Sequence, residues 1–241
     1  MSRTSSAAAE PTGMANHPSG GVDTAGPVPA HGQGPGLTTA AALGLAVVIG
    51  VAWGAATSGL QTVLSGPFSG LANAVGPWVV TAFAVGALCR RPGVAAAAGV
   101  LVCFGEVGGY YAVSALRDFG VNPSMVAFWA ITGVVGGPLF GLAGWFWRHA
   151  RSIRWTGASA ALMGGVFLTE GAVGYGYYLH HAGNAVLFCV IGALLVAALA
   201  ARAPAARSAG APGRALGAAM TWLLVVLPLG AAGQVVLRAV A

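Results

Sequence analysis

Long apolar runs alternate with short polar interruptions along most of the chain. Each run extends over roughly 18 residues or more, the length that an α-helix needs to cross about 30 Å of hydrocarbon. The runs predict spanning helices, with ends uncertain by a few residues, at 38–60, 72–89, 93–116, 124–147, 155–179, 184–201 and 215–236. The pattern therefore predicts an all-α transmembrane bundle of about seven spans within a domain at 37–241.

Composition supports lipid as the main solvent and partner of this domain. Hydrophobic residues make up 57% of the chain and charged residues 7%, whereas a soluble domain carries about 25% charged residues. A large core alone would bury part of this excess, but the length of the runs favours helices that span a bilayer. We therefore expect a multi-pass integral membrane protein.

The basic residues are all arginine, and they indicate topology rather than a nucleic-acid partner. They stand singly or in small groups between apolar runs, without the basic patch and interleaved aromatics that grip phosphates. Short cytoplasmic loops are enriched in arginine. The arginines predicted on one side are Arg90, Arg91, Arg148, Arg151, Arg154, Arg202, Arg207 and Arg214. Only Arg117 and Arg238 fall on the other side, which predicts a cytoplasmic N-terminus and an external C-terminus.

Two segments outside the predicted spans have their own composition. Residues 1–36 are rich in Ser, Ala, Pro and Gly, so we expect a disordered cytoplasmic tail rather than a signal peptide. The stretch Gln61–Trp78 is uncharged and rich in Gly, Ser and Pro. It is either a plain loop, which we expect, or a short re-entrant segment, which is tolerated only where protein buries it.

Glu106 and Glu170 are the only carboxylates inside the predicted spans, where an ionisable group costs on the order of 2.5 to 3.5 kcal/mol. Each lies 13 residues past a glycine that begins a similar Ala/Gly-rich pattern, Gly93 or Gly157, roughly 20 Å along the helix. The shared pattern suggests duplicated helical hairpins, although composition alone makes Ala/Gly helices look alike.

Polar side chains follow each glutamate at helical spacing. On the helix at 93–116 the stripe consists of Glu106, Tyr110, Ser114 and Arg117. On the helix at 155–179 it consists of Glu170, Tyr177, Tyr178 and His181, with Gly174 leaving a gap. Two such stripes facing each other would line an outward-opening polar cleft, in which the glutamates bind a cation or exchange a proton. Alternatively, the glutamates only hold helices together by hydrogen bonds.

The leading hypothesis is a small permease or channel-like protein that handles a small solute or cation at Glu106, Glu170, Tyr110, Ser114, Tyr177 and Tyr178. The competing hypothesis is a non-transporting scaffold or accessory subunit in which the glutamates are structural. An oligomer or a partner membrane protein stays open in either case.

Catalytic and cofactor chemistry has no support in the residue pattern, so we expect neither an enzyme nor a bound cofactor or metal. The chain lacks the lysine that a retinal Schiff base requires, and it has no P-loop, HExxH or GxSxG motif. Gly157–Ala160 resembles a rhomboid serine motif, but Ser159 and His181 would lie roughly 30 Å apart. The three cysteines form no CxxC pair, and adjacent His180 and His181 point about 100° apart on a helix.

Three GxxxG spacings would let helices approach closely. They are Gly50–Gly54, Gly105–Gly109 and Gly137–Gly141. In a chain with 39 glycines such matches are expected often, so they carry little weight by themselves.

Several phrases of the sequence together resemble a known family. They are LANAVGPWVVTAFAVGALCRRP, GEVGGYYAVSALR, GPLFGLAGWFWR and LTEGAVGYG. The combination is similar to an uncharacterised actinobacterial integral membrane family, domain of unknown function 6518, over about residues 40–200. The resemblance implies a helical membrane protein, and it brings no catalytic residues. Together with the Ala/Arg/Pro-rich, lysine-free composition of a GC-rich genome, it indicates a bacterial plasma (inner) membrane.

Overall fold

The computed structural model describes residues 37–240, and all the elements in that range are helical, as predicted. The elements are α1 (Thr39–Leu60), η1 (Gly66–Ala72), α2 (Val75–Leu88), α3 (Pro92–Leu116), α4 (Pro123–His149), α5 (Ile153–Thr169), η2 (Glu170–Tyr178), α6 (Ala182–Arg202), α7 (Pro204–Ser208) and α8 (Pro212–Val240). The tail expected at 1–36 lies outside the described residues.

Five helices of the described range are long and apolar enough to cross a membrane: α1, α3, α4, α6 and α8. The short 3-10 helix η1 and α2 pass the same test together, as one segment bent by 49°. Helix α5 has 17 residues and continues directly into η2, a π-helix of nine residues. The apolar helices indicate a membrane protein, and the count of seven crossings stays a prediction.

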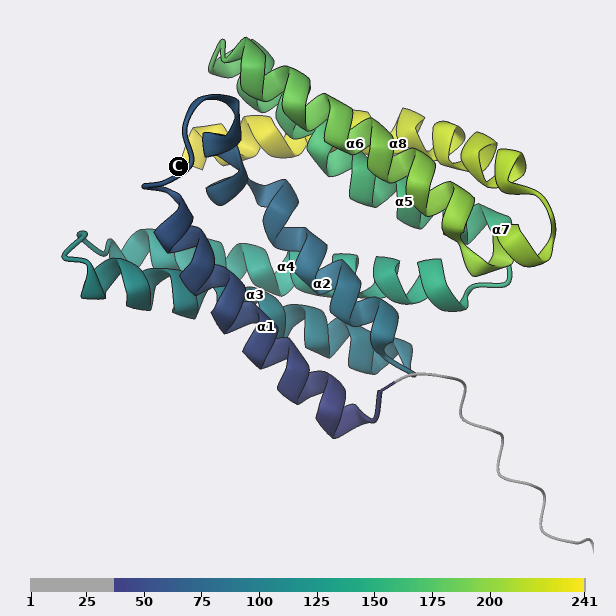
Figure 1. Cartoon of the computed structure of the whole chain (residues 1–241), viewed down its shortest axis with the longest axis horizontal. Helices are drawn as coiled ribbons and strands as arrows, with labels where there is room; N and C mark the ends of the chain where they lie inside the picture. Colours follow the sequence, from purple (N-terminus) through teal and green to yellow (C-terminus); the bar gives the residue numbers. More distant parts are fainter. Residues whose placement is uncertain (1–36, 241) are drawn as a thin grey trace, which may run out of the picture. The chain divides into compact units, whose positions relative to one another are not determined.

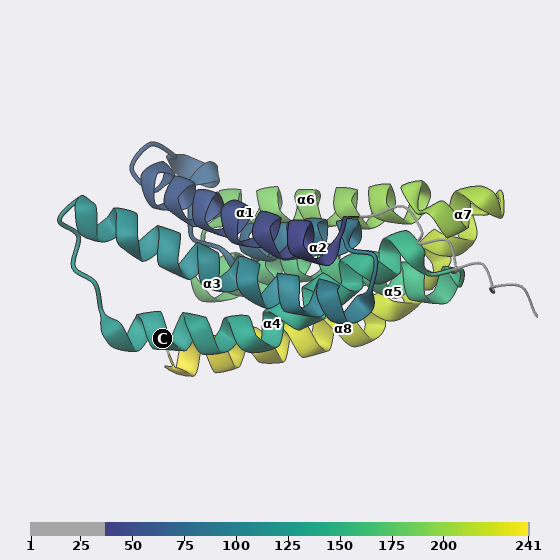
Figure 2. The same ribbon diagram turned by 90° about the horizontal axis from the view of Figure 1, so that it is seen from below.

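The helices of residues 37–240 form two neighbouring packing groups (Figure 1, Figure 2). Helices α1, α2, α3 and α4 pack on one another, and α5 packs with α6 and α8. Helix α2 and helix α4 also contact α5, so they join the groups. One cluster of buried side chains extends from Ala42 in α1 to Phe167 in α5 and Phe188 in α6. A second cluster lies between α5, α6, α7 and α8.

Glycines bring the helices of the first group into backbone contact. An added Cβ at Gly54 of α1 would lie 2.0 Å from the carbonyl oxygen of Glu106 in α3. One at Gly99 of α3 would lie 2.0 Å from the carbonyl oxygen of Gly137 in α4, and one at Gly144 of α4 would lie 1.9 Å from that of Phe83 in α2. Gly54 and Gly137 belong to the GxxxG spacings, which therefore take part in close helix contacts, whereas Gly99 and Gly144 make such contacts outside any of the three spacings.

The segment expected to be a plain loop is helical over Gly66–Ala72, so that expectation is corrected. Pro67, at the start of this 3-10 turn, has the fixed φ that suits a first helical position. The side-chain nitrogen Nδ2 of Asn184 in α6 donates a hydrogen bond of 3.1 Å to the carbonyl oxygen of Pro67. This contact with a distant helix holds the segment against the bundle.

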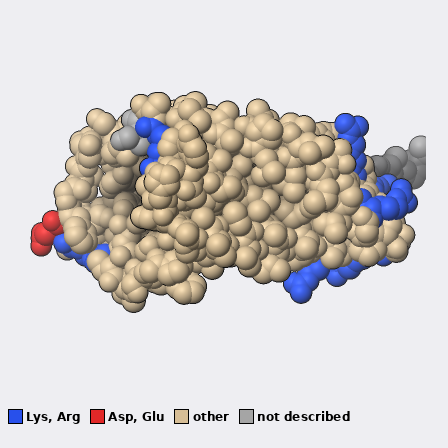
Figure 3. All heavy atoms as spheres, turned by 90° about the horizontal axis from the view of Figure 1, so that it is seen from above, with Lys and Arg blue, Asp and Glu red and all other residues tan. Residues whose placement is uncertain are grey.

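Most of the arginines in the described residues lie at one end of the helices. The connections α2–α3, α4–α5 and α6–α8 carry most of the arginines, and Figure 3 shows them gathered at one end. Asp118 follows the end of α3, whose start lies beside Arg90 and Arg91, so it lies at the other end of that helix. The arrangement has the asymmetry that the arginine pattern predicts.

Candidate functional site

Helix α2 begins inside the bundle without a capping side chain of its own. Its N-cap residue is Ala74, which offers no side-chain acceptor to the first backbone N–H groups. Such groups cost free energy when they are buried without a partner. The third position of the helix is Pro77, which has no N–H, so the N–H groups of Val75 and Gly76 are the first-turn donors that need an acceptor from outside the helix.

Glu170 supplies the missing acceptors from the junction of α5 and η2. Val75 N donates to Oε1 of Glu170 over 2.8 Å, and Gly76 N donates to Oε2 over 2.7 Å. The carboxyl group also lies at the positive end of the α2 dipole, which favours a negative charge. Glu170 is 6% exposed, and both of its oxygens are bonded. Its geometry is that of an interhelical N-cap.

Glu106 has a different environment, in the middle of α3. Its side chain is 1% exposed, and its Oε1 accepts a hydrogen bond from the hydroxyl of Thr81 in α2. The same hydroxyl lies 2.6 Å from the carbonyl oxygen of Trp78, so its single hydrogen is shared between two acceptors. Oε2 of Glu106 has no partner, and it is the only carboxylate oxygen among the buried unpartnered side-chain atoms of residues 37–240.

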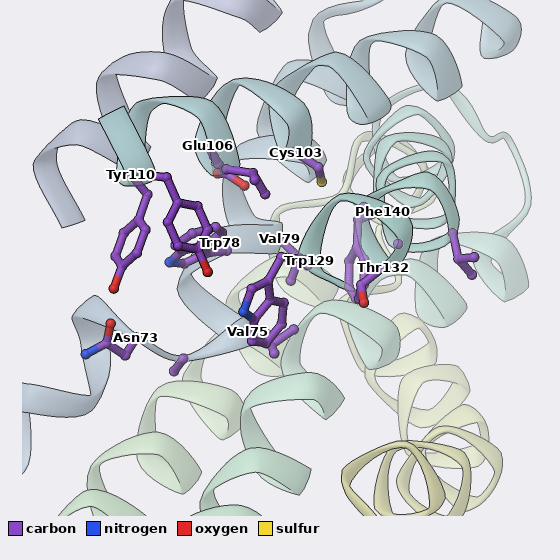
Figure 4. Close-up of a pocket in the computed structure, with 16 residues that line it drawn as sticks. Asn73, Val75, Trp78, Val79, Cys103, Glu106, Tyr110, Trp129, Thr132 and Phe140 are labelled. Atoms are coloured by element: carbon purple, nitrogen blue, oxygen red, sulfur yellow. The ribbon is translucent and has the colours of Figure 1, made fainter. Parts of the chain in front are cut away.

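A cavity of about 450 Å³ lies beside Glu106, between α2, α3 and α4 (Figure 4). Its walls are largely apolar and aromatic. The residues that line it include Trp78, Val79, Cys103, Glu106, Tyr110, Tyr111, Trp129, Thr132 and Phe140. Thr132 and Val135 are solvent- or lipid-exposed members of the lining, so the cavity opens along α4. Its size falls in the range of small-molecule sites.

The remaining polar stripe of α3 turns toward α1. The side-chain nitrogen of Gln61 donates to the hydroxyl of Tyr110 over 2.7 Å, and the hydroxyls of Ser58 and Ser114 lie 2.8 Å apart. Arg117 donates to the carbonyl oxygen of Ser58. The stripe exists as the spacing predicts, but Ser114 takes part in the α1–α3 contact and does not line the cavity.

The stripe expected on the fifth helix does not form. From Glu170 to Tyr178 the segment is a π-helix, in which bonds run from i to i+5. Residues at i+7 and i+8 therefore leave the face of Glu170. Tyr177 is 71% exposed, and Tyr178 lies on the surface under Arg238, 5.0 Å from the ring of Tyr177. Tyr175 turns inward instead, with its ring centroid 4.9 Å from that of Phe188.

The two glutamates therefore do not share a cleft of facing stripes. Helix α3 packs mainly on α1 and α4, and α5 packs mainly on α8 and α6. Each glutamate instead bonds to α2, Glu170 at its first turn and Glu106 at Thr81. Positions 76 and 81 point about 140° apart on a helix, so the two carboxyl groups approach α2 from different sides.

Sequence reasoning missed the α2 and α4 residues of the site. Thr81 is the only hydroxyl residue in α2, and a lone polar side chain in an apolar helix was the available signal for it. Trp129 and Phe140 carried no such signal, because aromatic residues are common on lipid-facing and packed helix surfaces alike. Among residues 37–240 no group of three His, Cys, Asp or Glu side chains is placed to hold a metal ion.

These features define a protein whose described residues are helical, with five apolar helices long enough to cross a membrane and a buried carboxyl group beside an aromatic cavity. The chain belongs to DUF6518, a family of unknown function, whose family model matches residues 33–231. The resemblance to domain of unknown function 6518 is thereby confirmed, and an actinobacterial origin stays a prediction. A search of curated proteins finds no match. A search of solved structures finds none either.

Proposed function

We propose that the protein is a multi-pass protein of a bacterial plasma membrane, with seven crossings and its N-terminus in the cytoplasm. Five apolar helices support the membrane location. Helix α2 with η1, and α5 with η2, supply the two further crossings. The arginine-rich connections support the orientation, because short arginine-rich loops stay cytoplasmic.

The orientation predicts which engineered cysteines react from outside the cell. With Cys89, Cys103 and Cys189 replaced by alanine, we expect Asp118→Cys to react with a membrane-impermeant maleimide in intact cells. Ser208→Cys, between Arg207 and the loop that precedes α8, is expected to react only after permeabilisation. Both positions are exposed, which makes them a matched pair. The opposite labelling pattern would reverse the proposed orientation.

We further propose that the cavity beside Glu106 binds a small solute as part of a permease or channel-like function. The unpartnered Oε2 of Glu106 carries this proposal, because a buried carboxylate oxygen without a partner costs free energy that a ligand can recover. No arginine or histidine lines the cavity, whereas aromatic rings do. Such walls suit a small organic cation, through cation–π contacts and an ion pair with Glu106.

The competing role, a non-transporting scaffold or accessory subunit, is favoured by one observation. Glu170 has both oxygens bonded to α2, so it has a complete structural role and needs no ligand. The same reasoning does not extend to Glu106, whose Oε2 is unpartnered. Catalysis has no comparable support, so we propose binding and passage of a solute rather than an enzyme reaction.

Glu106→Gln is expected to weaken the binding of 2-phenylethylamine by at least about tenfold, because a hydrogen bond to a charged group is worth roughly 1.5–3 kcal/mol. Calorimetric titration of the purified protein in nanodiscs measures this, and flux into proteoliposomes is expected to fall with it. The uncharged 2-phenylethanol controls for the apolar body of the probe. Ser114→Ala is the matched protein control, because Ser114 contacts Ser58 and not the cavity.

Equal binding of the amine by wild type and Glu106→Gln would contradict a role for this carboxyl group in the site. If flux is also unchanged while thermal stability falls, Glu106 is structural and the scaffold role replaces the proposed one.

A further inference from the structure

A second hollow lies at the arginine-rich end, remote from Glu106. It has a volume of about 700 Å³ and lies between the start of α5, the α7 segment and the start of α8. Its lining includes Arg151, Ser152, Arg154, Ser208 and Arg214. We call this set the arginine groove. Three guanidinium groups and two hydroxyl groups thus come together from segments far apart in the sequence.

The charges of the arginine groove are not neutralised by carboxylates within residues 37–240. The carboxylates in that range are Glu106, Asp118 and Glu170. Both glutamates are buried and bonded to α2, and Asp118 follows the end of α3 that is opposite to Arg90 and Arg91. Arg151 and Arg214 form no ion pair in the described part of the chain, and Arg154 lies 5.8 Å from the ring centre of Trp222. The groove therefore presents concentrated positive charge to an anion.

The start of α5 adds donors of the same sign. Ser152 is the N-cap residue, and its side chain makes no capping bond. The first backbone N–H groups of α5 and the positive end of its dipole therefore face the groove without a side-chain acceptor. The guanidinium groups of arginine and the backbone N–H groups at a helix N-terminus are both donors that suit the oxygens of a phosphate group.

The surroundings of the groove are those of a site at the edge of a bilayer. Trp155 is 48% exposed and stacks between Phe146 and Trp222, at rings 5.4 Å and 6.3 Å away, as aromatic residues at a headgroup boundary do. Further along α8 from the groove, the apolar side chains of Met220 and Leu224 are exposed, Leu224 by 77%. A phospholipid with its phosphate in the groove would lay its acyl chains along this apolar face.

We propose that the arginine groove is a binding site for a phosphate ester, which its position at the bilayer edge would supply as the headgroup of an anionic phospholipid. Basic pockets between helices on the cytoplasmic side are suited to such headgroups. The site is independent of the Glu106 cavity, since the two share no lining residue.

Native mass spectrometry of the whole protein in detergent tests the proposal, with dioleoylphosphatidylglycerol as the probe. The charge-assisted hydrogen bonds from one arginine to a phosphate are worth at least about tenfold in affinity, so Arg151→Gln with Arg214→Gln is expected to weaken binding at least about 100-fold. The matched control is Arg202→Gln with Arg207→Gln, which removes the same charge at the same end from residues that do not line the groove. The control is expected to weaken binding less than about threefold.

Dioleoylglycerol, which lacks the phosphate, is expected not to bind. Equal weakening by the two double variants, or equal binding of dioleoylglycerol, would overturn the proposal and leave only a general attraction of the arginines to anionic lipid. Glycerol 3-phosphate distinguishes the sources of the phosphate group. Displacement of the lipid by it would identify a soluble phosphate ester as a ligand, and retention of the lipid would identify the phospholipid. Both results support a phosphate site.

Discussion

Glu170→Ala is expected to lower the free energy of unfolding by about 2–6 kcal/mol, one of the two largest effects expected in this protein. The change removes the acceptors of Val75 N and Gly76 N, and each buried N–H left unpaired costs about 1–3 kcal/mol. After this change no side chain close to α2 in the sequence can take over the cap, because Ala74 occupies the N-cap position. Thermal unfolding in detergent, followed by circular dichroism, measures the loss.

Two further variants make this expectation specific. Glu170→Gln keeps one oxygen acceptor and turns an N–H donor toward the second backbone N–H, so it is expected to lose about half as much. Glu106→Gln removes the other buried glutamate but keeps an acceptor for Thr81, so we expect its stability to stay within about 1 kcal/mol of wild type. Unchanged stability of Glu170→Ala would show that α2 does not depend on this cap.

The helices of the fold were predictable because lipid imposes one strong rule. Backbone groups in hydrocarbon must bond within their own segment, so long apolar runs become helices whatever else they contact. Helix α2 shows where the rule weakens. Its apolar run is as evident as the others, yet the helix has 14 residues, since the preceding Gly66–Ala72 forms a separate 3-10 turn. The bond from Asn184 to Pro67, across 117 positions, leaves no trace in local sequence.

The site was predictable only in part, for reasons that lie in helix geometry. Spacing of 3.6 residues placed Tyr110 near Glu106 correctly, and both line the cavity. The same spacing failed after Glu170, because the π-helix changes which residues share a face, and Tyr177 and Tyr178 moved to the surface. The different roles of the two glutamates depend on α2, whose backbone donates to Glu170 and whose Thr81 side chain donates to Glu106. The position along the helix that the sequence predicts, 13 residues past a glycine for both, did not separate them.

Gly54→Val is expected to destabilise the protein by about 3 kcal/mol, through the contact between α1 and α3. An added Cβ would lie 2.0 Å from the carbonyl oxygen of Glu106 and 2.7 Å from its Cα, and both are backbone atoms that no rotamer change can move. The helices must separate, and forcing extra volume into a packed interior costs about 1–3 kcal/mol, occasionally more. A displacement of α3 at Glu106 is also expected to weaken the binding of a ligand in the cavity.

Gly44 in the same helix provides the matched control for this contact. A Cβ there meets nothing within 4 Å, so Gly44→Val changes the same residue type in α1 without touching α3. Valine has a slightly higher helix propensity than glycine, so Gly44→Val is expected to leave stability unchanged or to raise it by less than about 0.5 kcal/mol. Thermal unfolding of both variants in one detergent gives the comparison. Equal stabilities would mean that α1 and α3 are not held in backbone contact at Gly54, and Glu106 would then lose the wall that fixes its position beside the cavity.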